Sequence, residues 1–432
     1  MIDLTDETNA MPAALLIGVD IGNTENFERS MDEMERLIVA CDMEPVGRVV
    51  QNMPNPNSAT YVGSGKVAEI ALMAQGLKAQ YVIFEENLSP AQLKNLQREI
   101  DAIVMDRTAL ILEIFSKRAQ SKEARLQVEL AHLQYMLPRL VGLRSQLGRQ
   151  GGASGAMSNK GSGEKQIELD RRRIEKRISE LRRELRTIEE NRVIQRTARH
   201  RSNIPRVALV GYTNAGKSTM MNTLISRSGG TKEKMVFEKD LLFATLDTTV
   251  RRIETGDRKD FLLSDTVGFV SNLPHDLVQA FHSTLEEVRD ADLLLVVIDA
   301  SDEKWKEEKA VTEETLREIG AKDIPKLYVM NKADRVYPLG TLPKVLMDTE
   351  TRIYLSAKED VGVDRLLELV KERIYETNKL CKLKIPYTEG ALLGEINAKA
   401  RIVSREYLED GIYIEADCPI ALAGKIEKWL QD

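Results

Sequence analysis

The sequence VALVGYTNAGKST, from Val207 to Thr219, decides the fold of the central part of this chain. An apolar run predicts a strand, a GxxxxGKS loop follows it, and a helical pattern begins directly after the loop. A GxxxxGKS loop between a strand and a helix is the arrangement that binds phosphate. A plain glycine turn before a helix would require neither the preceding strand nor the GxxxxGKS pattern. Gly211 and Gly216 let the backbone N–H groups point at phosphates. Lys217 supplies positive charge to the β and γ phosphates, and the Ser218 hydroxyl is placed to bind magnesium.

A second motif, SDTVGF from Ser264 to Phe269, follows the apolar residues FLL. Asp265 is therefore expected at the end of a strand, where its carboxylate can hold magnesium through water. The N–H of Gly268 is then placed to meet the γ phosphate. Together with the first motif, this one predicts a nucleoside triphosphate site of the P-loop type.

Two further motifs select the base. VMNKAD (Val329 to Asp334) and YLSAK (Tyr354 to Lys358) each end a predicted strand. The Asp334 carboxylate can accept from both N1–H and the 2-amino group of guanine. Adenine offers neither donor, so a buried Asp334 would stay unpaired with ATP. The backbone N–H of Ala357 can bond to O6 of guanine. The four motifs in this order predict guanine and exclude a general ATPase.

Residues 12 to 106 alternate apolar runs with helical patterns, which predicts a small parallel-sheet α/β domain. The expected strands are Ala13 to Asp20, Val46 to Gln51, Tyr81 to Glu86 and Ala102 to Asp106, and the helices lie around 31–40, near 67–75 and from Ser89, with Pro90 at the first helical position. YVGSGK (Tyr61 to Lys66) resembles half of a phosphate loop. No apolar strand precedes it and no Ser or Thr follows the Lys, so we interpret it as a turn into a helix.

The next segment is polar, helical and basic. Between Lys117 and Arg201 the chain has 21 Lys and Arg against 10 Asp and Glu, although the whole chain carries a net charge of −6. Helices are expected over 121–147 and 166–199. The second carries a coiled-coil seam of Ile174, Ile178, Leu181, Leu185 and Ile188. The glycine-rich break between the two helices, residues 147–163, predicts an antiparallel hairpin with a mobile tip. The basic charge favours nucleic-acid binding over a solvated linker.

Composition sets the remaining limits. Hydrophobic residues make up 42% of the chain and charged residues 30%, which excludes a mainly disordered protein. The longest apolar run, Leu293 to Ile298, is far too short for a membrane span, and the start MIDLTDET does not resemble a signal peptide. Three scattered cysteines fit a reducing compartment. We therefore expect a cytoplasmic protein.

We expect an α/β protein of four parts. These are an N-terminal small parallel-sheet α/β domain (1–115), a basic antiparallel helical hairpin (116–203), a P-loop GTPase domain (204–377) and a small C-terminal α+β domain (378–432). In the last part, strands near 382–387, 401–406 and 411–416 and helices from Thr388 and Pro419 are expected, with the sequence EDG at a turn.

The chain resembles the HflX family of ribosome-associated GTPases over nearly its full length, and residues 211–358 resemble a translation-factor-type small GTPase domain. The segments that carry the resemblance are NPNSATYVGSGKVAEI (55–70), DRTALILEIF (106–115), GSGEKQIELDRRRIEKRI (161–178), GYTNAGKS (211–218) and LLFATLDTTVRRI (241–253). The resemblance implies a GTP-hydrolysing switch whose GTP form binds stalled or idle ribosomes, chiefly the large subunit and its rRNA, and promotes separation of the subunits.

Two other functions remain open. One is a regulatory GTPase acting on protein partners, with the hairpin as a dimerisation coiled coil. The other is an RNA-binding module whose GTPase serves only as an assembly check.

The resemblance also bears on magnesium. Thr245, Thr248 and Thr249 can each supply a magnesium ligand by their chemistry alone. The family identifies the FATLD stretch, Phe243 to Asp247, as the first switch, which selects Thr245 beside Ser218. On this interpretation Thr245 contacts the γ phosphate and magnesium and is released after hydrolysis.

Catalysis presents a gap. Many GTPases carry a glutamine directly after DTVG that orients the attacking water, but this chain has Phe269. An aromatic ring cannot orient water by hydrogen bonding, so unaided hydrolysis should be slow, with Lys217 supplying charge to the transition state. In similar GTPases an asparagine at the position of Asn214 helps to hold potassium beside the phosphates. An asparagine that only caps the loop is the alternative.

The residues expected to contact the nucleotide come from five short segments. They are Gly211, Tyr212, Thr213, Asn214, Ala215, Gly216, Lys217, Ser218 and Thr219; Phe243, Ala244, Thr245, Leu246 and Asp247; Asp265, Thr266, Val267 and Gly268; Asn331, Lys332, Ala333 and Asp334; and Ser356, Ala357 and Lys358.

Overall fold

The computed structural model describes residues 11–22, 24–149, 160–200, 204–228, 243, 249–255, 259–266, 268–269, 287–338, 352–375 and 378–431. The chain divides into two units. Unit 1 comprises Met1–Arg186 with Glu238–Asp247 and Val270–Ser283, and unit 2 comprises Thr187–Phe237, Thr248–Phe269 and Thr284–Asp432.

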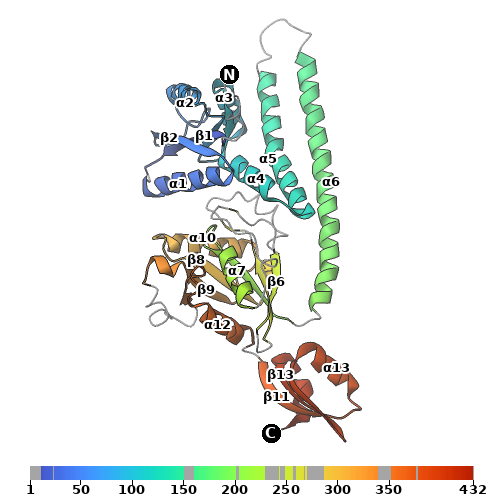
Figure 1. The fold of residues 1–432 in the computed structure, drawn as a ribbon. Helices are drawn as coiled ribbons and strands as arrows, with labels where there is room; N and C mark the ends of the chain where they lie inside the picture. Colours follow the sequence, from blue (N-terminus) through green and yellow to red (C-terminus); the bar gives the residue numbers. More distant parts are fainter. Residues whose placement is uncertain are drawn as a thin grey trace, which may run out of the picture. The chain divides into compact units, whose positions relative to one another are not determined.

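Unit 1 begins with the predicted parallel-sheet α/β domain, and the structure confirms that fold. Its elements are β1 (Ala13–Asp20), α1 (Thr24–Ala40), β2 (Glu44–Asn52), α2 (Ser64–Gly76), β3 (Tyr81–Phe84), α3 (Pro90–Glu99), β4 (Ile103–Met105) and α4 (Arg107–Arg118). The strands form one four-stranded sheet in the order β2-β1-β3-β4, and every pair in it is parallel. Figure 1 shows α2 and α3 on one side of this sheet and α1 with α4 on the other.

Local sequence explains where these helices begin. The Ser89 hydroxyl accepts from the Gln92 N–H, the Gln92 side chain accepts from the Ser89 N–H, and Pro90 occupies the first turn, so α3 starts with a complete capping box. The YVGSGK segment leads into α2, which begins at Ser64 after Gly63. This segment is a turn into a helix, as predicted.

The basic segment forms the predicted antiparallel hairpin of α5 (Lys122–Arg149) and α6 (Lys160–His200). Glu129 of α5 pairs with Arg177 of α6 at 2.7 Å, and Lys122 of α5 lies 3.9 Å from Glu184 of α6. The later residue of α5 thus meets the earlier residue of α6, so the two helices are antiparallel. Ile178 of the predicted seam is buried. Figure 1 shows the two helices side by side.

The prediction placed the glycine-rich tip at 147–163, and its C-terminal boundary was wrong. Helix α6 begins at Lys160, so Gly161 and Gly163 are helical. Each glycine lowers helix stability by about 1 kcal/mol relative to alanine. This cost is outweighed because the helix continues over a long run of Lys, Glu, Arg and Gln. Residues 150–159 of the tip lie outside the described part of the chain.

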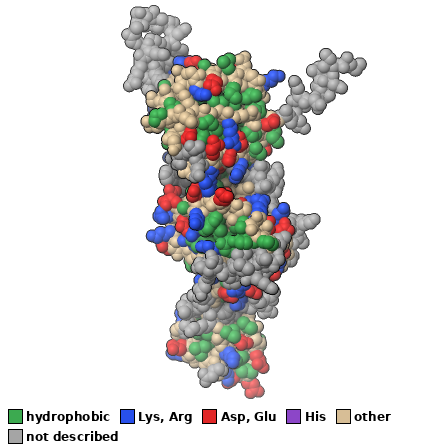
Figure 2. Space-filling view, turned by 90° about the vertical axis from the view of Figure 1, so that its left-hand side faces the viewer, with side chains coloured by type: hydrophobic (Ala, Val, Ile, Leu, Met, Phe, Trp, Pro, Cys, Tyr) green, Lys and Arg blue, Asp and Glu red, His purple; other side chains and the backbone are tan. Residues whose placement is uncertain are grey.

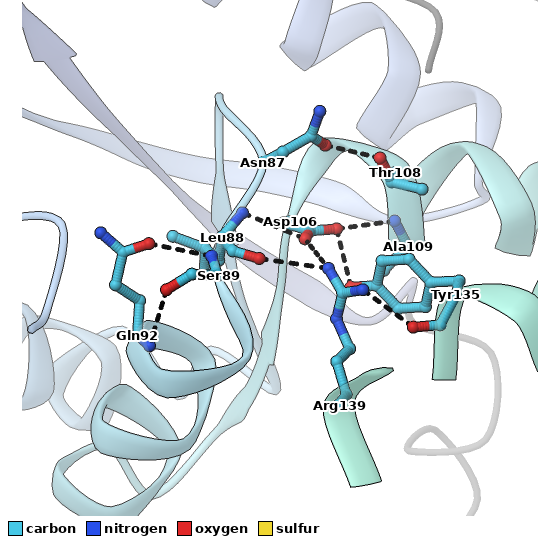
Figure 3. Close-up of polar contacts among 9 residues, drawn as sticks. All are labelled: Asn87, Leu88, Ser89, Gln92, Asp106, Thr108, Ala109, Tyr135 and Arg139. Carbon is cyan, nitrogen blue, oxygen red and sulfur yellow. Dashed lines mark hydrogen bonds and ion pairs between the residues drawn. The ribbon is translucent and has the colours of Figure 1, made fainter. Parts of the chain in front are cut away.

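A buried charged network joins α5 to the sheet of unit 1 (Figure 3). Asp106, fully buried at the end of β4, caps α4 by accepting from the Ala109 N–H at 2.8 Å. The same carboxylate accepts from the Tyr135 hydroxyl and from Arg139, both at 2.8 Å, and the Arg139 guanidinium lies 3.3 Å from the centre of the Tyr135 ring. Its fourth donor is the Leu88 N–H at 3.2 Å. Tyr135 and Arg139 are one helical turn apart, so a single face of α5 supplies both.

Unit 2 contains the predicted GTPase fold. Its elements are β5 (Arg206–Gly211), α7 (Lys217–Arg227), β6 (Thr249–Ile253), β7 (Phe261–Asp265), β8 (Leu293–Asp299), α10 (Trp305–Glu318), β9 (Lys326–Asn331), the 3₁₀ turn η3 (Ala333–Arg335), β10 (Arg352–Tyr354) and α12 (Val363–Tyr375). The six-stranded sheet has the order β10-β9-β8-β5-β7-β6, and β6 is its one antiparallel strand. Every predicted motif therefore lies where a strand ends, at the edge where open α/β sheets bind ligands.

The C-terminal module is also α+β, as predicted. It consists of β11 (Asn378–Ile385), α13 (Gly390–Lys399), β12 (Arg401–Leu408), β13 (Gly411–Pro419), α14 (Ile420–Ile426), the 3₁₀ turn η5 (Glu427–Trp429) and β14 (Leu430–Gln431). The antiparallel sheet has the order β12-β13-β11-β14, the arrangement of a ferredoxin-like βαββαβ unit. The prediction missed β14, because two residues are too few to show an alternating pattern.

On the face shown in Figure 2, Lys and Arg side chains are interspersed with Asp and Glu. Within the part of the chain that the structure describes, no helix combines the length and the apolar character that crossing a membrane requires. Cys41 and Cys418 are buried and Cys381 is partly exposed. Burial raises the pKa of the Cys41 thiol to about 11.

Replacing Asp106 by alanine should destabilise unit 1 selectively. The change removes one member of a buried ion pair and leaves Arg139 without its carboxylate, a loss of about 3 kcal/mol in the free energy of unfolding. Both tryptophans of the chain, Trp305 and Trp429, lie in unit 2. Urea unfolding followed by far-UV circular dichroism should therefore show an earlier transition in Asp106→Ala, while tryptophan emission changes at the wild-type concentration.

The matched control for this experiment is Asp101→Ala, at an exposed position of the same domain. Its unfolding should match the wild type within about 0.5 kcal/mol. Equal stability of the Asp106 and Asp101 variants would show that the network contributes nothing.

Candidate functional site

The loop between β5 and α7 approaches its neighbours so closely that two positions require glycine. Gly211 has φ +146°, and a Cβ there would lie 2.2 Å from the backbone oxygen of Val297. Gly216 has φ +93°, and a Cβ there would lie 2.2 Å from Nδ2 of Asn331. Both backbone conformations disfavour any side chain. The loop is thereby held against the ends of β8 and β9.

Lys217, the first residue of α7, lies across this loop. Its Nζ donates to the backbone oxygens of Gly211 at 3.0 Å and Tyr212 at 2.7 Å. Burial lowers the pKa of this ammonium to about 8, and the Asp265 carboxylate opposes that shift. A buried cation fixed by two carbonyls beside backbone N–H groups is suited to bind an anion such as phosphate.

Ser218 and Asp265 are the oxygen donors of the site. The Ser218 hydroxyl donates to Oδ2 of Asp265 at 2.8 Å, and the Asp265 side chain is fully buried at the end of β7. A hydroxyl and a carboxylate are hard oxygen ligands of the kind that magnesium takes with water and substrate phosphates. The residues present therefore fit a magnesium ion.

Asn331, the last residue of β9, joins two loops through its buried amide. Its Nδ2 donates to the backbone oxygen of Ala215 at 2.9 Å, and its Oδ1 accepts from the Ala357 N–H at 3.0 Å. This pairing differs from the predicted partner of Ala357. A bond from the Ala357 N–H to O6 of guanine would have to share or replace the bond to Asn331.

Lys332 and Asp334 of the NKAD motif are partly exposed, whereas Ala333 is buried. Asp334 lies in η3, and its contact with guanine stays a prediction. Lys332 has φ +57°, and its Nζ pairs with Oδ2 of Asp299 at 2.8 Å. The sequence interpretation missed Asp299, although it directly follows the apolar run of β8 and satisfies the same strand-end rule as Asp265.

Phe269 is fixed to the phosphate loop by its backbone. Its N–H donates to the Gly211 oxygen at 3.1 Å and its carbonyl accepts from the Thr213 N–H at 2.7 Å. The ring is only 5% exposed. The ring has no group that donates or accepts a hydrogen bond, and the absence of a water-orienting side chain here stays a prediction.

Other expected site residues have different surroundings. Thr266 donates to the Leu209 backbone oxygen at 2.7 Å, which ties the strand end to β5. Phe243 has φ +55°, and its ring meets Phe115 of α4 edge-on at 4.7 Å within unit 1. Thr249 is the first residue of β6. Ala244, Thr245, Leu246, Asp247, Thr248 and Val267 lie outside the described residues.

The remaining expected residues belong to the loops just described. Tyr212, Asn214 and Thr219 lie in or beside the phosphate loop, with Asn214 exposed; Ala333 and Ser356 are buried, and Lys358 is exposed. Thr223 was not predicted. Its hydroxyl donates to the Ala357 oxygen at 2.8 Å, a contact between α7 and the loop after β10 that no local motif indicates.

The fold and this arrangement of loops define a P-loop GTPase. Comparison with protein families agrees with this class. Residues 28–116 match the family described as GTP-binding GTPase N-terminal, and residues 118–199 match the family described as GTP-binding GTPase middle region. Residues 206–332 match the family described as 50S ribosome-binding GTPase. The chain belongs to the HflX family of GTPases and is a GTP-hydrolysing enzyme.

Two GTPase HflX proteins support this assignment. The GTPase HflX of Lacrimispora saccharolytica is 40% identical over 98% of this chain and 97% of its own length. That of Escherichia coli K12 is 38% identical over 94% and 92%. A GTP-binding protein from Sulfolobus solfataricus, crystallised with GDP, is 26% identical, covers 85% of this chain and 98% of its own, and superposes with a TM-score of 0.44.

Removing the Asn331 amide should weaken nucleotide binding. Asn331→Ala leaves the Ala215 oxygen and the Ala357 N–H without their partner, a loss of about 1–3 kcal/mol. The dissociation constant for GDP, measured by calorimetry, should therefore rise by about 5- to 150-fold. Asn397→Ala, at an exposed position of α13, is the control and should bind GDP as the wild type does. A GDP affinity of Asn331→Ala within twofold of the wild type would refute this role.

Proposed function

We propose that this chain is a GTP-dependent switch that binds the ribosome, chiefly the rRNA of the large subunit, and promotes dissociation of the subunits. The observation that carries the proposal is the match of residues 206–332 to the profile of 50S ribosome-binding GTPases, in a chain related to HflX proteins over nearly its whole length. The basic hairpin of unit 1 supports it, because it adds positive charge to an acidic protein.

At the nucleotide, each loop has one task. Backbone N–H groups of the phosphate loop and the first turn of α7, together with the Lys217 ammonium, hold the phosphates, and Asp334 accepts from the guanine edge. Ser218 and Thr245 would hold magnesium, which supplies charge stabilisation to the phosphates when bound. Asp265 orients the Ser218 hydroxyl through the 2.8 Å bond between them.

The potassium assignment rests on Asn214. Its side chain is exposed and its backbone is left-handed, with φ +61°, as Asn tolerates better than most residues. We propose that this side-chain oxygen helps to hold a potassium ion beside the phosphates. A loop cap remains the alternative, and hydrolysis rates in potassium and sodium salts separate the two.

The hairpin has cations that RNA can reach. Arg171, Arg172 and Arg173 pair with acids on their own helix, Glu175, Glu168 and Asp170, at 2.9, 3.2 and 3.4 Å. Such exposed pairs contribute about 0.3–0.5 kcal/mol each. When these arginines bind RNA phosphates, counterions held by the RNA are released as well, which favours binding. The weak pairs with acids on the same helix therefore do not prevent RNA binding.

The hairpin also bears on the alternative of a dimerisation coiled coil. Ile178 and Leu181 of the seam are already buried in unit 1. A dimer that used these two residues would first have to expose them. That observation favours the ribosome over a dimer that uses the same residues.

The switch depends on a difference in the affinity of the docked conformation for GTP and for GDP. GTP stabilises the conformation that docks on the ribosome, and hydrolysis removes the γ phosphate and favours release. Gradient co-sedimentation with ribosomes in the presence of a non-hydrolysable GTP analogue is the direct test. Equal sedimentation with GDP, or none with the analogue, would refute the switch.

Asp334→Asn tests the guanine assignment. The amide presents a donor where the carboxylate presented an acceptor, so it no longer matches guanine but suits xanthine. GTP affinity should fall by about 100-fold or more, while affinity for xanthosine triphosphate should rise. Calorimetry with both nucleotides checks this, and an unchanged GTP affinity would remove Asp334 from the base site.

Neutralising three arginines tests the hairpin. Reversing them to Glu would add like charges one turn from existing acids, so the sharper variant is Arg171→Gln, Arg172→Gln, Arg173→Gln. If they contact phosphates, ribosome affinity should fall and the log–log salt slope should become shallower by roughly 2–3. Intrinsic GTP hydrolysis should not change.

Arg365→Gln is the control, since Arg365 also forms exposed pairs with Glu368 and Glu372 but lies on α12. It should leave the salt slope unchanged. A triple variant that binds ribosomes as the wild type does across the titration would make the hairpin a spacer or dimer element.

A further inference from the structure

Thr213 carries a buried hydroxyl that the described structure does not use. The residue is 6% exposed, and among the described residues its Oγ1 has no hydrogen-bond partner. Buried hydroxyls are ordinarily paired, because leaving one unpaired loses the bonds it made to water. Thr213 is the third residue of the phosphate loop, so a partner supplied by the bound nucleotide would account for the arrangement.

The backbone fixes where this residue lies. The Thr213 N–H donates to the Phe269 oxygen at 2.7 Å, which holds the loop against the residue after Gly268. A Cβ added to Gly268 would lie 2.7 Å from Cγ2 of Thr213 and 3.0 Å from Nζ of Lys217. The Thr213 side chain, the Gly268 backbone and the Lys217 ammonium are therefore close neighbours.

These neighbours meet the terminal phosphate if the proposed nucleotide contacts are correct, and the inference rests on them. Lys217, the Gly268 N–H and Thr245 are the groups assigned to the γ phosphate. GDP lacks this phosphate, so a further group there distinguishes the triphosphate from the diphosphate. Phe269 cannot provide such a group, because its side chain neither donates nor accepts a hydrogen bond.

We propose that Thr213 is a catalytic residue whose hydroxyl donates a hydrogen bond to a γ-phosphoryl oxygen of GTP. In hydrolysis the water oxygen bonds to the γ phosphorus as the bond to the GDP oxygen breaks, and the water proton ends on phosphate. Thr213 neither gains nor loses a proton. Its bond stabilises the charge on the transferred group in a site where the glutamine position holds Phe269.

A packing role is the other explanation for this residue, since its methyl group touches Gly268. Two substitutions separate the explanations. Thr213→Val keeps the shape and removes the hydroxyl, whereas Thr213→Ser keeps the hydroxyl and removes the methyl group. Thr315→Val on α10 is the control: its hydroxyl bonds to the Val311 oxygen at 2.9 Å within the same helix.

The experiment uses the full chain and measures GDP affinity and single-turnover GTP hydrolysis. Thr213→Val should bind GDP within twofold of the wild type and hydrolyse bound GTP about 10- to 100-fold more slowly, as expected for a lost bond to a charged group. Thr213→Ser should stay within threefold of the wild-type rate, and Thr315→Val should match it.

Three results would overturn the inference. A wild-type rate in Thr213→Val would show that the hydroxyl is not used, and equal losses in the Val and Ser variants would assign the effect to packing. Loss of GDP binding in Thr213→Val would show that the contact is not specific to the γ phosphate. If Lys217→Ala and Asp334→Asn leave GTP binding unchanged, the nucleotide contacts themselves are wrong, which is a separate failure.

Discussion

Close approach of backbone to backbone at the phosphate loop is the constraint on which the nucleotide site depends. Gly211 and Gly216 lie so near to β8 and to Asn331 that no Cβ fits. The cost is a loop whose glycines lose much conformational freedom on folding. The gain is a loop and one ammonium held in place before any ligand arrives, which is how a protein limits reorganisation on binding.

The two units solve the problem of a buried charge in different ways. In unit 1, Asp106 is compensated by Arg139, by two backbone N–H groups and by Tyr135, so both of its carboxylate oxygens are paired within the protein. In unit 2, Lys217 is buried against carbonyls and its pKa falls to about 8. The paired carboxylate stabilises a joint between a helix and a sheet, whereas the Lys217 site is arranged to accept an anion.

The sequence predicted the parts of this structure that local pattern determines. Strand, loop and helix at Val207 to Thr219 follow from an apolar run and glycine spacing, and the capped start of α3 follows from Ser89 and Pro90. The features that the sequence could not predict depend on contacts between residues that are far apart in the sequence. Asp106 meets Arg139 across 33 positions, and Asn331 meets Ala357 across 26, so neither pairing leaves a periodic signal. The helical state of Gly161 likewise depends on the long helix that follows it, which the helix propensity of glycine does not reflect.

The three thiols have a practical consequence. Alkylating reagents attack the thiolate, and the burial that raises the pKa of Cys41 to about 11 leaves almost none of it at neutral pH. Cys418 is buried as well, whereas Cys381 on β11 is partly exposed. A maleimide dye should therefore attach preferentially to Cys381 in the native wild-type chain. The ferredoxin-like module thus offers a single attachment point for fluorescence without any substitution.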